Sequence, residues 1–211
     1  MNSVEKQNKL AEIKLRLEQS VASLPIAEKP TDIVFGEGSS EAEIVLIGEA
    51  PGYNEHVQRR PFVGRSGQLL RKTLTQVGYP PEQVYITNIV KARPPDNRDP
   101  SPEEILAYKS FLDQEITLIN PKLIITLGRF SMAKFLTDVK ISQVHGRLHK
   151  VRWNNQITYV LPMYHPAAAL RSTQMLTAFT QDFEKVAKIL DWVKQQRELI
   201  LEVETITDAL L

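Results

Sequence analysis

Short apolar runs alternate along the chain with segments of helical periodicity. Residues 44–47 (IVLI) are wholly apolar, which is typical of a buried parallel strand. Two further strands are predicted at residues 84–87 and 122–127. Apolar residues recur at helical spacing near residues 3–20, 67–77, 101–120, 130–136 and 175–195. This order indicates an α/β fold, a three-layer α/β/α sandwich, and one domain over residues 1–211 in which 1–30 form an N-terminal helix and loop.

A fourth and a fifth strand are expected near the C-terminal side of this pattern. Residues 145–153 and 158–164 have the composition of two paired strands, and Asn154 and Asn155 lie at the turn between them. The second of these strands is followed directly by His165 and Pro166.

Polar side chains follow three of the predicted strands, at the point where each strand ends. They are Glu49, Asn88 and His165. Each alone is commonly a turn-forming or structural residue. The carboxyl ends of strands in an open α/β sheet meet at the edge where ligands bind, so we expect the three to converge. Phe62 lies nearby, in the turn-rich stretch 48–67 that follows the first strand.

The chemistry of these four side chains suits recognition of a nucleobase. An asparagine amide offers a donor and an acceptor, which matches the imide edge of uracil. Phe62 is able to stack on a ring, and a neutral His165 is able to donate a hydrogen bond to a departing base as negative charge builds on it. Glu49 is suited to orienting a water or opposing positive charge on the sugar.

Six ordered motifs give the chain its resemblance to a known family. They are GEAPG at 48–52, RPFVG at 60–64, GQLL at 67–70, YITN at 85–88, the 91–98 segment KARPPDNR, and HPAAALR at 165–171. With them the sequence resembles the family 4 uracil-DNA glycosylases from about residue 34 to the last helix. The resemblance implies a four-stranded parallel sheet flanked by helices and hydrolysis of the N-glycosidic bond of deoxyuridine in DNA, which leaves an abasic site.

The resemblance also implies roles for individual residues. Gly48, Phe62 and Asn88 would bind uracil, and Glu49 and His165 would be catalytic. The segment 166–171 resembles a wedge that enters the minor groove, so Pro166 and Leu170 are expected to contact DNA.

Net charge is only +1, so the overall charge gives no argument for nucleic acid. The basic residues are nevertheless concentrated between positions 59 and 98, which predicts a phosphate-binding face. We expect phosphate contacts from Arg65, Lys91, Arg93, Arg98 and Arg171. The alternative for Arg93 and Arg98 is that they only brace the proline-rich loop.

The sequence departs from the family at its metal cofactor. The family usually has four cysteines that hold an iron–sulfur cluster, whereas this chain has no cysteine. Alignment on the motifs places Val21, Leu24, Ala92 and Tyr108 at those positions, so we predict no cluster and no cofactor. The replacements are largely apolar, and we expect the four to pack together as a core patch.

Other departures leave the water-activating group open. His56 replaces an acid, Arg59 replaces a glycine, and Ala50 stands beside Glu49 where no aspartate is present. His145 and His149 lie four residues apart, but the sequence offers no obvious third ligand, so we predict no metal site.

We therefore predict a monofunctional uracil-DNA glycosylase without a cluster, acting on single- or double-stranded DNA. The alternatives are a non-catalytic DNA-binding module of the same fold and a glycosylase for another deaminated base. The sequence shows no signal-peptide core and no run of apolar residues long enough to span a membrane. We expect a cytoplasmic monomer with no membrane partner.

Overall fold

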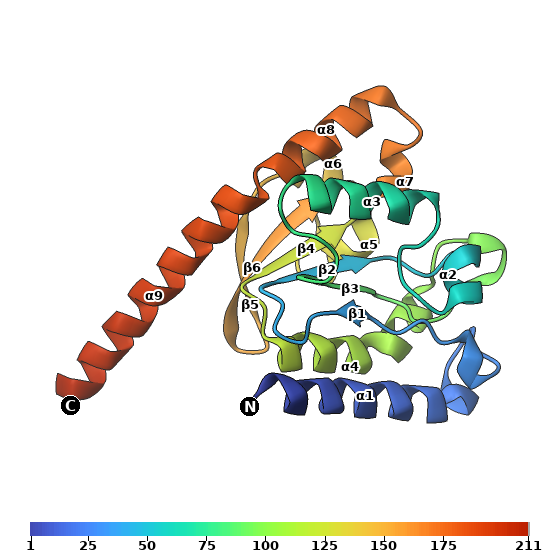
Figure 1. Cartoon of the computed structure of the whole chain (residues 1–211), viewed down its shortest axis with the longest axis horizontal. Coiled ribbons are helices and arrows are strands. Elements are labelled where there is room, and N and C mark those ends of the chain that lie inside the picture. Colours follow the sequence, from blue (N-terminus) through green and yellow to red (C-terminus); the bar gives the residue numbers. More distant parts are fainter. Residues whose placement is uncertain (211) are drawn as a thin grey trace.

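A mixed six-stranded sheet forms the centre of the molecule, with helices on both faces (Figure 1). The computed structural model describes residues 1–210, and the side chains of residues 1–199. The strands are β1 (Glu37–Gly38), β2 (Ile44–Gly48), β3 (Tyr85–Asn88), β4 (Leu123–Leu127), β5 (His149–Trp153) and β6 (Gln156–Met163). Their order across the sheet is β1-β3-β2-β4-β6-β5.

The four central strands are parallel, and both edge strands are antiparallel to their neighbours. The α/β class and the four parallel strands are therefore confirmed. Two antiparallel edge strands complete the sheet: β5, which was predicted as the partner of β6, and β1, which was not predicted as a strand. The two-residue strand β1 carries too few residues to show a pattern, and β5 pairs with β6 around Asn154 and Asn155, whose positive φ angles (48° and 61°) suit a tight hairpin turn.

The helices cover the sheet in two groups. Their bounds are α1 (Ser3–Gln19), α2 (Tyr53–Gln58), α3 (Arg65–Gln76), α4 (Pro102–Ile119), α5 (Arg129–Ala133), α6 (Ile141–Val144), α7 (Pro166–Ala169), α8 (Thr173–Glu184) and α9 (Val186–Leu210). In Figure 1, α1 and α4 lie below the sheet, whereas α3, α8 and the first part of α9 lie above it.

Alternation along β2 shows how one strand serves both layers. Val45 and Ile47 pack in the core cluster with α1 and α4, and Ile44 and Leu46 pack in the cluster with α3, α8 and α9. All four side chains are at most 1% exposed. A fully apolar run is required here because both faces of a central parallel strand are covered.

Helices differ from the sequence-based prediction in three places. The short helices α2 and α6 were not predicted, since six and four residues are too few for a periodic signal. The predicted last helix is divided into α8 and α9, and α9 extends away from the sheet in Figure 1. Among the residues described, none of the helices is both long enough and apolar enough to cross a membrane.

Helix α4 begins close to the predicted position, residue 101, and its first turn forms a capping box. The Ser101 hydroxyl accepts from the Glu104 backbone N–H at 3.3 Å, and Glu104 Oε2 accepts from the Ser101 N–H at 2.8 Å. Glu104 also pairs with Arg98, at 2.5 Å and 2.8 Å. The helix start therefore anchors the loop that connects β3 to α4.

Candidate active site

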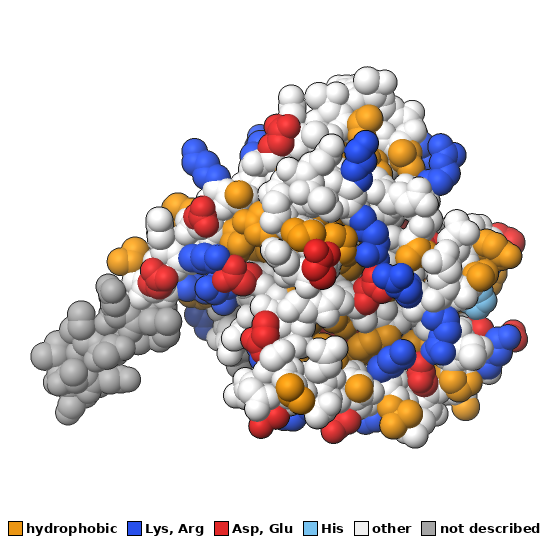
Figure 2. Space-filling view, in the orientation of Figure 1, with side chains coloured by type: hydrophobic (Ala, Val, Ile, Leu, Met, Phe, Trp, Pro, Cys, Tyr) orange, Lys and Arg blue, Asp and Glu red, His pale blue; other side chains and the backbone are white. Residues whose placement is uncertain are grey.

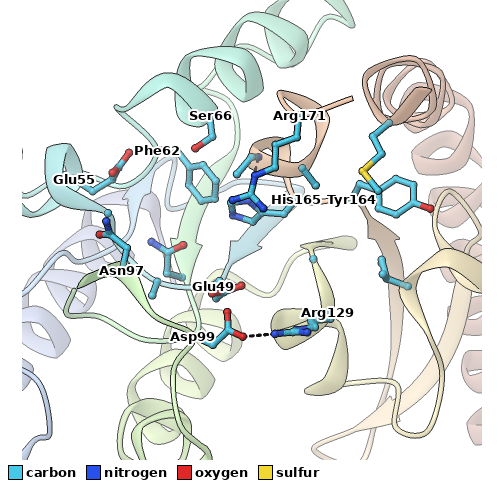
Figure 3. Close-up of a pocket in the computed structure, with 18 residues that line it drawn as sticks. Glu49, Glu55, Phe62, Ser66, Asn97, Asp99, Arg129, Tyr164, His165 and Arg171 are labelled. Carbon is cyan, nitrogen blue, oxygen red and sulfur yellow. Dashed lines mark hydrogen bonds and ion pairs between the residues drawn. The ribbon is translucent and has the colours of Figure 1, made fainter. Parts of the chain in front are cut away.

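One cleft of about 720 Å³ opens at the carboxyl edge of the parallel strands. Glu49 follows β2, Asn88 ends β3 and His165 follows β6, and all three side chains line this cleft together with Phe62 (Figure 3). The register explains the convergence, because Gly48 pairs with Asn88 across two adjacent parallel strands.

Asn88 lies on the floor of the cleft and is only 2% exposed. Its Oδ1 is buried and accepts no hydrogen bond from the residues that the structure describes. An unpaired buried amide oxygen costs roughly 1–3 kcal/mol, so it is expected where a ligand will supply the partner. A Cβ added at Gly48 would overlap both Asn88 Oδ1 and the Phe62 ring, so only glycine leaves the two side chains their places.

Phe62 is held in a strained backbone conformation. Its φ is +53°, which is uncommon for a residue other than glycine, and its side chain is 5% exposed. The Glu55 carboxylate holds the following turn, since Oε1 accepts from the backbone N–H of Val63 at 2.8 Å and of Gly64 at 2.7 Å. Sequence reasoning gave Glu55 no role, because its partners are backbone groups eight and nine residues away.

Arg71 on α3 holds the same loop from the other side. Its Nε donates to the Phe62 carbonyl and one terminal nitrogen donates to the Pro61 carbonyl, each at 2.7 Å. That terminal nitrogen also pairs with Glu37, which Arg60 contacts at 2.8 Å. These bonds offset the cost of the Phe62 conformation and fix the ring over Asn88.

His165 faces the Phe62 ring, with ring centroids 5.8 Å apart. Its Nδ1 accepts from the Ala167 backbone N–H at 3.2 Å, so in the neutral ring the proton resides on Nε2. Burial lowers the pKa of His165 to about 4; the positive charge of Arg171 acts in the same direction and Glu55 opposes it. At neutral pH the imidazole is therefore uncharged and is a donor only through Nε2.

Glu49 is partly exposed in the cleft and feels the charges of Asp99 and Arg129, which also line it. Burial raises the pKa of Glu49 above its ordinary value; the Asp99 carboxylate acts in the same direction and Arg129 opposes it. Asp99 and Arg129 are paired with each other, as Figure 3 shows. Neither residue was predicted as part of the site.

Comparison with known proteins accounts for this arrangement. The family model described as the uracil DNA glycosylase superfamily matches residues 35–194. A type-4 uracil-DNA glycosylase of Archaeoglobus fulgidus is 41% identical over 166 residues, which cover 75% of this chain and 82% of the relative. One from Thermotoga maritima is 37% identical over 186 residues, 87% of this chain and 96% of the relative. A third, from Sulfurisphaera tokodaii, is 41% identical over 75% of each chain.

The chain belongs to the type-4 uracil-DNA glycosylase family. The predicted family resemblance is thereby confirmed.

One residue predicted to contact DNA phosphate lies in the core of this family member. Lys91 is fully buried, and its Nζ is 2.5 Å from Glu115 Oε1 and also bonds the Thr87 hydroxyl. Glu115 is equally buried and accepts from Tyr85 Oη at 3.1 Å and from Thr87 Oγ1 at 2.8 Å. The prediction for Lys91 was wrong, because the buried carboxylate of Glu115 on α4 binds its ammonium group.

Fewer of the basic residues between positions 59 and 98 are free to bind phosphate than the sequence indicates. Five of the basic residues between positions 59 and 98 pair with carboxylates: Arg59, Arg60, Arg71, Lys91 and Arg98. In the view of Figure 2, acidic and basic side chains are interspersed over the surface. Much of the positive charge in this segment is therefore neutralised by ion pairs that hold loops in place.

The other predicted DNA-binding residues lie around the cleft in different settings. Arg171 lines it, Arg65 is exposed where α3 begins, and Leu170 is 45% exposed beside buried Pro166. Arg93 and Arg98 both bond within their own loop region. Arg93 Nε donates to Asn97 Oδ1 at 2.8 Å and its guanidinium lies over the Tyr53 ring at 5.4 Å, while Arg98 pairs with Glu104.

The four positions that the alignment assigns to the family's cluster ligands, called the patch below, all belong to the same side of the core. Val21, Ala92 and Tyr108 are buried in the core cluster beside α1 and α4, and Leu24 packs against the same cluster. Tyr108 Oη donates to the Pro25 carbonyl at 2.7 Å. A chain with no cysteine offers no thiolate, so it cannot carry a cysteine-ligated iron–sulfur cluster.

His145 and His149 have separate surroundings. His145 Nδ1 lies 2.7 Å from Asp182 Oδ2. His145 therefore has an acidic partner, which the sequence did not indicate because Asp182 is 37 residues away. Within the described residues no group of three or more histidine, cysteine, aspartate or glutamate side chains is placed to hold a metal ion.

Proposed function

We propose that this family member hydrolyses the N-glycosidic bond of deoxyuridine in DNA, releasing uracil and leaving an abasic site. The observation that carries the proposal is the buried, unpartnered Asn88 Oδ1 beneath Phe62, with the neutral His165 ring beside them. It is supported by the family and by type-4 relatives at 37–41% identity.

Base selection rests on Asn88. Its Oδ1 accepts from N3–H of uracil and its amide nitrogen donates to O4, while Phe62 stacks on the ring. Cytosine has no hydrogen at N3 and carries an amino group at position 4, so it would leave the buried amide unpaired. A polar site of this kind rejects the wrong partner more strongly than an apolar pocket does. The Gly48 backbone leaves the space that the base edge needs.

Bond cleavage rests on His165. As the C1′–N1 bond breaks, its electron pair moves onto the uracil ring and negative charge builds on O2. The His165 Nε2–H donates to that oxygen, because the Ala167 N–H already occupies Nδ1. A neutral donor aimed at a developing charge in a partly buried site gives stabilisation that is larger in the transition state than in the ground state.

Water addition at C1′ completes the hydrolysis. Glu49 is the carboxylate nearest to this chemistry among the predicted residues, and in its ionised form it opposes the positive charge that develops on the sugar. Water oxygen bonds to C1′, one water proton goes to solvent through the cleft, and uracil leaves as an anion that is protonated afterwards. Arg171, Arg65 and the exposed Leu170 would hold the strand from which the base is flipped.

The direct test is release of uracil from an oligonucleotide that carries one deoxyuridine, followed by alkaline cleavage at the abasic site. We expect strand cleavage with wild-type protein on single- or double-stranded DNA and none with a thymidine control. A folded wild-type protein that cleaves neither substrate would contradict the proposal.

The same experiment separates the two alternatives. Hypoxanthine and xanthine oligonucleotides tested beside uracil report a glycosylase for another deaminated base. DNA binding with no release of any of these bases would indicate the non-catalytic module.

A further inference from the structure

The cleft continues well beyond the uracil-binding residues. Its lining also includes Ile141, Tyr164 and Met175. In Figure 3, Tyr164 lies beyond His165 as seen from Phe62, on the side that we call the far end. The volume of the cleft, about 720 Å³, is several times that of a pyrimidine ring. The far end is apolar and aromatic, and none of its three residues has a role in releasing the base.

Tyr164 at this far end is held by a chain of contacts that the glycosylase chemistry does not use. Its ring packs against His145, with centroids 4.3 Å apart and planes tilted by 33°. His145 in turn bonds Asp182 on α8, which is 3% exposed and also pairs with Lys185 at 2.8 Å.

Gly146 allows this contact to form. Its φ is +67°, and a Cβ at this position would overlap the Asp182 carboxylate. Asp182 is therefore able to reach His145 only because a glycine follows that histidine. The result is a tyrosine ring that is oriented before any ligand arrives.

Two cationic side chains line the same cleft. Arg171 is one of them, and Arg129, whose side chain is 64% exposed and pairs with Asp99, is the other. An oriented aromatic ring in a cleft that also carries positive charge is the arrangement that proteins use to hold single-stranded nucleic acid, because every base has a face that stacks.

We propose that Tyr164 is the stacking platform for the base of the nucleotide next to the uracil on the same strand. The proposal rests on the proposed function, since it takes the uracil to lie between Phe62 and Asn88. The occupant follows from continuity: the cleft runs without interruption from His165 to Tyr164, so the chain that enters with the flipped uracil passes this ring. Stacking of this kind holds the strand without selecting a base, and it predicts that the protein distinguishes substrates by the presence of a neighbouring base.

Binding of short single-stranded oligonucleotides tests the proposal without catalysis. Each carries a 2′-fluoro-deoxyuridine that resists hydrolysis, and the neighbouring nucleotide on the 5′ side, the 3′ side or neither is replaced by an abasic tetrahydrofuran. Fluorescence anisotropy should show about tenfold weaker binding of wild-type protein to one of the two abasic oligonucleotides, a difference of about 1.4 kcal/mol. Tyr164→Ala should bind all three equally, and Tyr164→Phe should behave as wild type.

Trp192→Ala is the matched control, because Trp192 is an exposed aromatic residue on α9 and does not line the cleft. It should keep the wild-type dependence on the neighbouring base. Tyr164→Leu serves as a second variant that fills more of the space if Tyr164→Ala unfolds below the assay temperature.

Two results would overturn the proposal: wild-type affinity that is the same for all three oligonucleotides, or a Tyr164→Ala variant that keeps the wild-type difference between them. A Tyr164→Ala variant that weakens every oligonucleotide by the same factor, with the difference intact, would assign the ring a structural role only. Failure of the proposed function is visible separately, as absent uracil release by a wild-type protein that still shows the dependence on a neighbouring base.

Discussion

His165 and Gly48 show how single residues decide the chemistry of the cleft. The backbone N–H of Ala167 and the surrounding burial keep His165 neutral with its proton on Nε2, and the missing side chain of Gly48 leaves room for Asn88 and Phe62. Both effects are local, and each has a direct experimental consequence.

Replacing His165 by alanine should lower kcat for uracil release by about 10²–10³-fold, because one donor to a developing anion is lost. In the wild type, His165 should impose no fall in kcat as pH rises from about 6.5, since its folded-state pKa is about 4. A decline through this range that His165→Ala abolishes would show that the imidazolium is the active form. Single-turnover rates across the pH range provide the measurement.

Stability should respond to the same pKa. Between pH 6.5, the ordinary pKa of histidine, and about pH 4, the pKa of His165 in the folded state, the unfolded state binds the proton more readily than the folded state. The contribution of His165 to the free energy of unfolding is therefore complete above pH 6.5 and is lost as pH falls toward 4. Comparison of urea unfolding of wild type and His165→Gln over this window isolates it.

Gly48→Ala should abolish uracil release, because the new Cβ overlaps Asn88 Oδ1 and the Phe62 ring. The fold should persist, because the three atoms nearest to the new Cβ all belong to these two cleft side chains. Rates on the uracil oligonucleotide and thermal unfolding are to be measured together. Gly78→Ala is a control of a different kind: a Cβ there meets nothing within 4 Å, so its only cost is the positive φ of 87°. Near-normal activity of Gly48→Ala would contradict the description of the cleft floor.

The conformation of the loop that carries Phe62 is stabilised by side chains from outside the loop. The loop between α2 and α3 keeps its strained turn because Glu55 holds two backbone N–H groups and Arg71 holds two carbonyl groups. Both long side chains come from the flanking helices.

Glu55→Ala should reduce the free energy of unfolding by about 2–4 kcal/mol, because two N–H groups lose their buried acceptor. Activity should fall as well, since the Phe62 ring is no longer fixed above Asn88. Urea denaturation and uracil release are the two measurements, with the exposed Glu82→Ala as the matched control. Equal stability of the two variants would show that the turn holds itself.

The Lys91–Glu115 pair lies beneath β3 and gives a prediction about stability, not about DNA. Lys91→Met should cost about 3–5 kcal/mol, because it leaves a buried carboxylate without its cation. Lys91→Met/Glu115→Gln should recover most of this loss, as glutamine still accepts from Tyr85 and Thr87. Chemical denaturation measures both variants.

DNA binding provides the complementary measurement. The double variant should keep the wild-type dependence of affinity on salt, whereas Arg171→Ala should reduce the slope by about 0.7–0.9 for one lost phosphate contact. A smaller slope in the double variant would mean that Lys91 reaches DNA after all.

These elements also mark how far the sequence alone was informative. Apolar runs with polar residues at their ends located β2, β3 and the residues that line the cleft, because strand burial and turn chemistry are local properties. The burial of Lys91 and the roles of Glu55, Asp99 and Arg129 depend on partners distant in the chain, which no local pattern contains. The charge concentration between residues 59 and 98 was interpreted as a ligand surface because the acids that neutralise it come from elsewhere.

Across the whole molecule, the patch of Val21, Leu24, Ala92 and Tyr108 connects the N-terminal segment with the loop after β3 and with α4. In the family these segments are usually joined by a metal cluster. Here they are joined by apolar packing and one hydrogen bond, which makes the patch part of the main core on that side of the sheet.

Truncation of this patch should be costly. Tyr108→Ala should lower the free energy of unfolding by about 3–5 kcal/mol, as expected for removal of a buried aromatic side chain. Tyr108→Phe should cost only about 1 kcal/mol, the value of its bond to the Pro25 carbonyl. Thermal unfolding of both variants, with and without an iron chelator, tests the prediction, and stability that changes with the chelator would contradict it.

The absence of cysteine has a consequence for the conditions in which this fold persists. Oxidants dismantle iron–sulfur clusters by attacking iron and the thiolates that hold it, and scarcity of iron prevents such clusters from being built. A chain that joins the same segments with valine, leucine, alanine and tyrosine offers no such target. We therefore expect folding of this chain to require no iron and to involve no oxidation of a cluster or of a thiol.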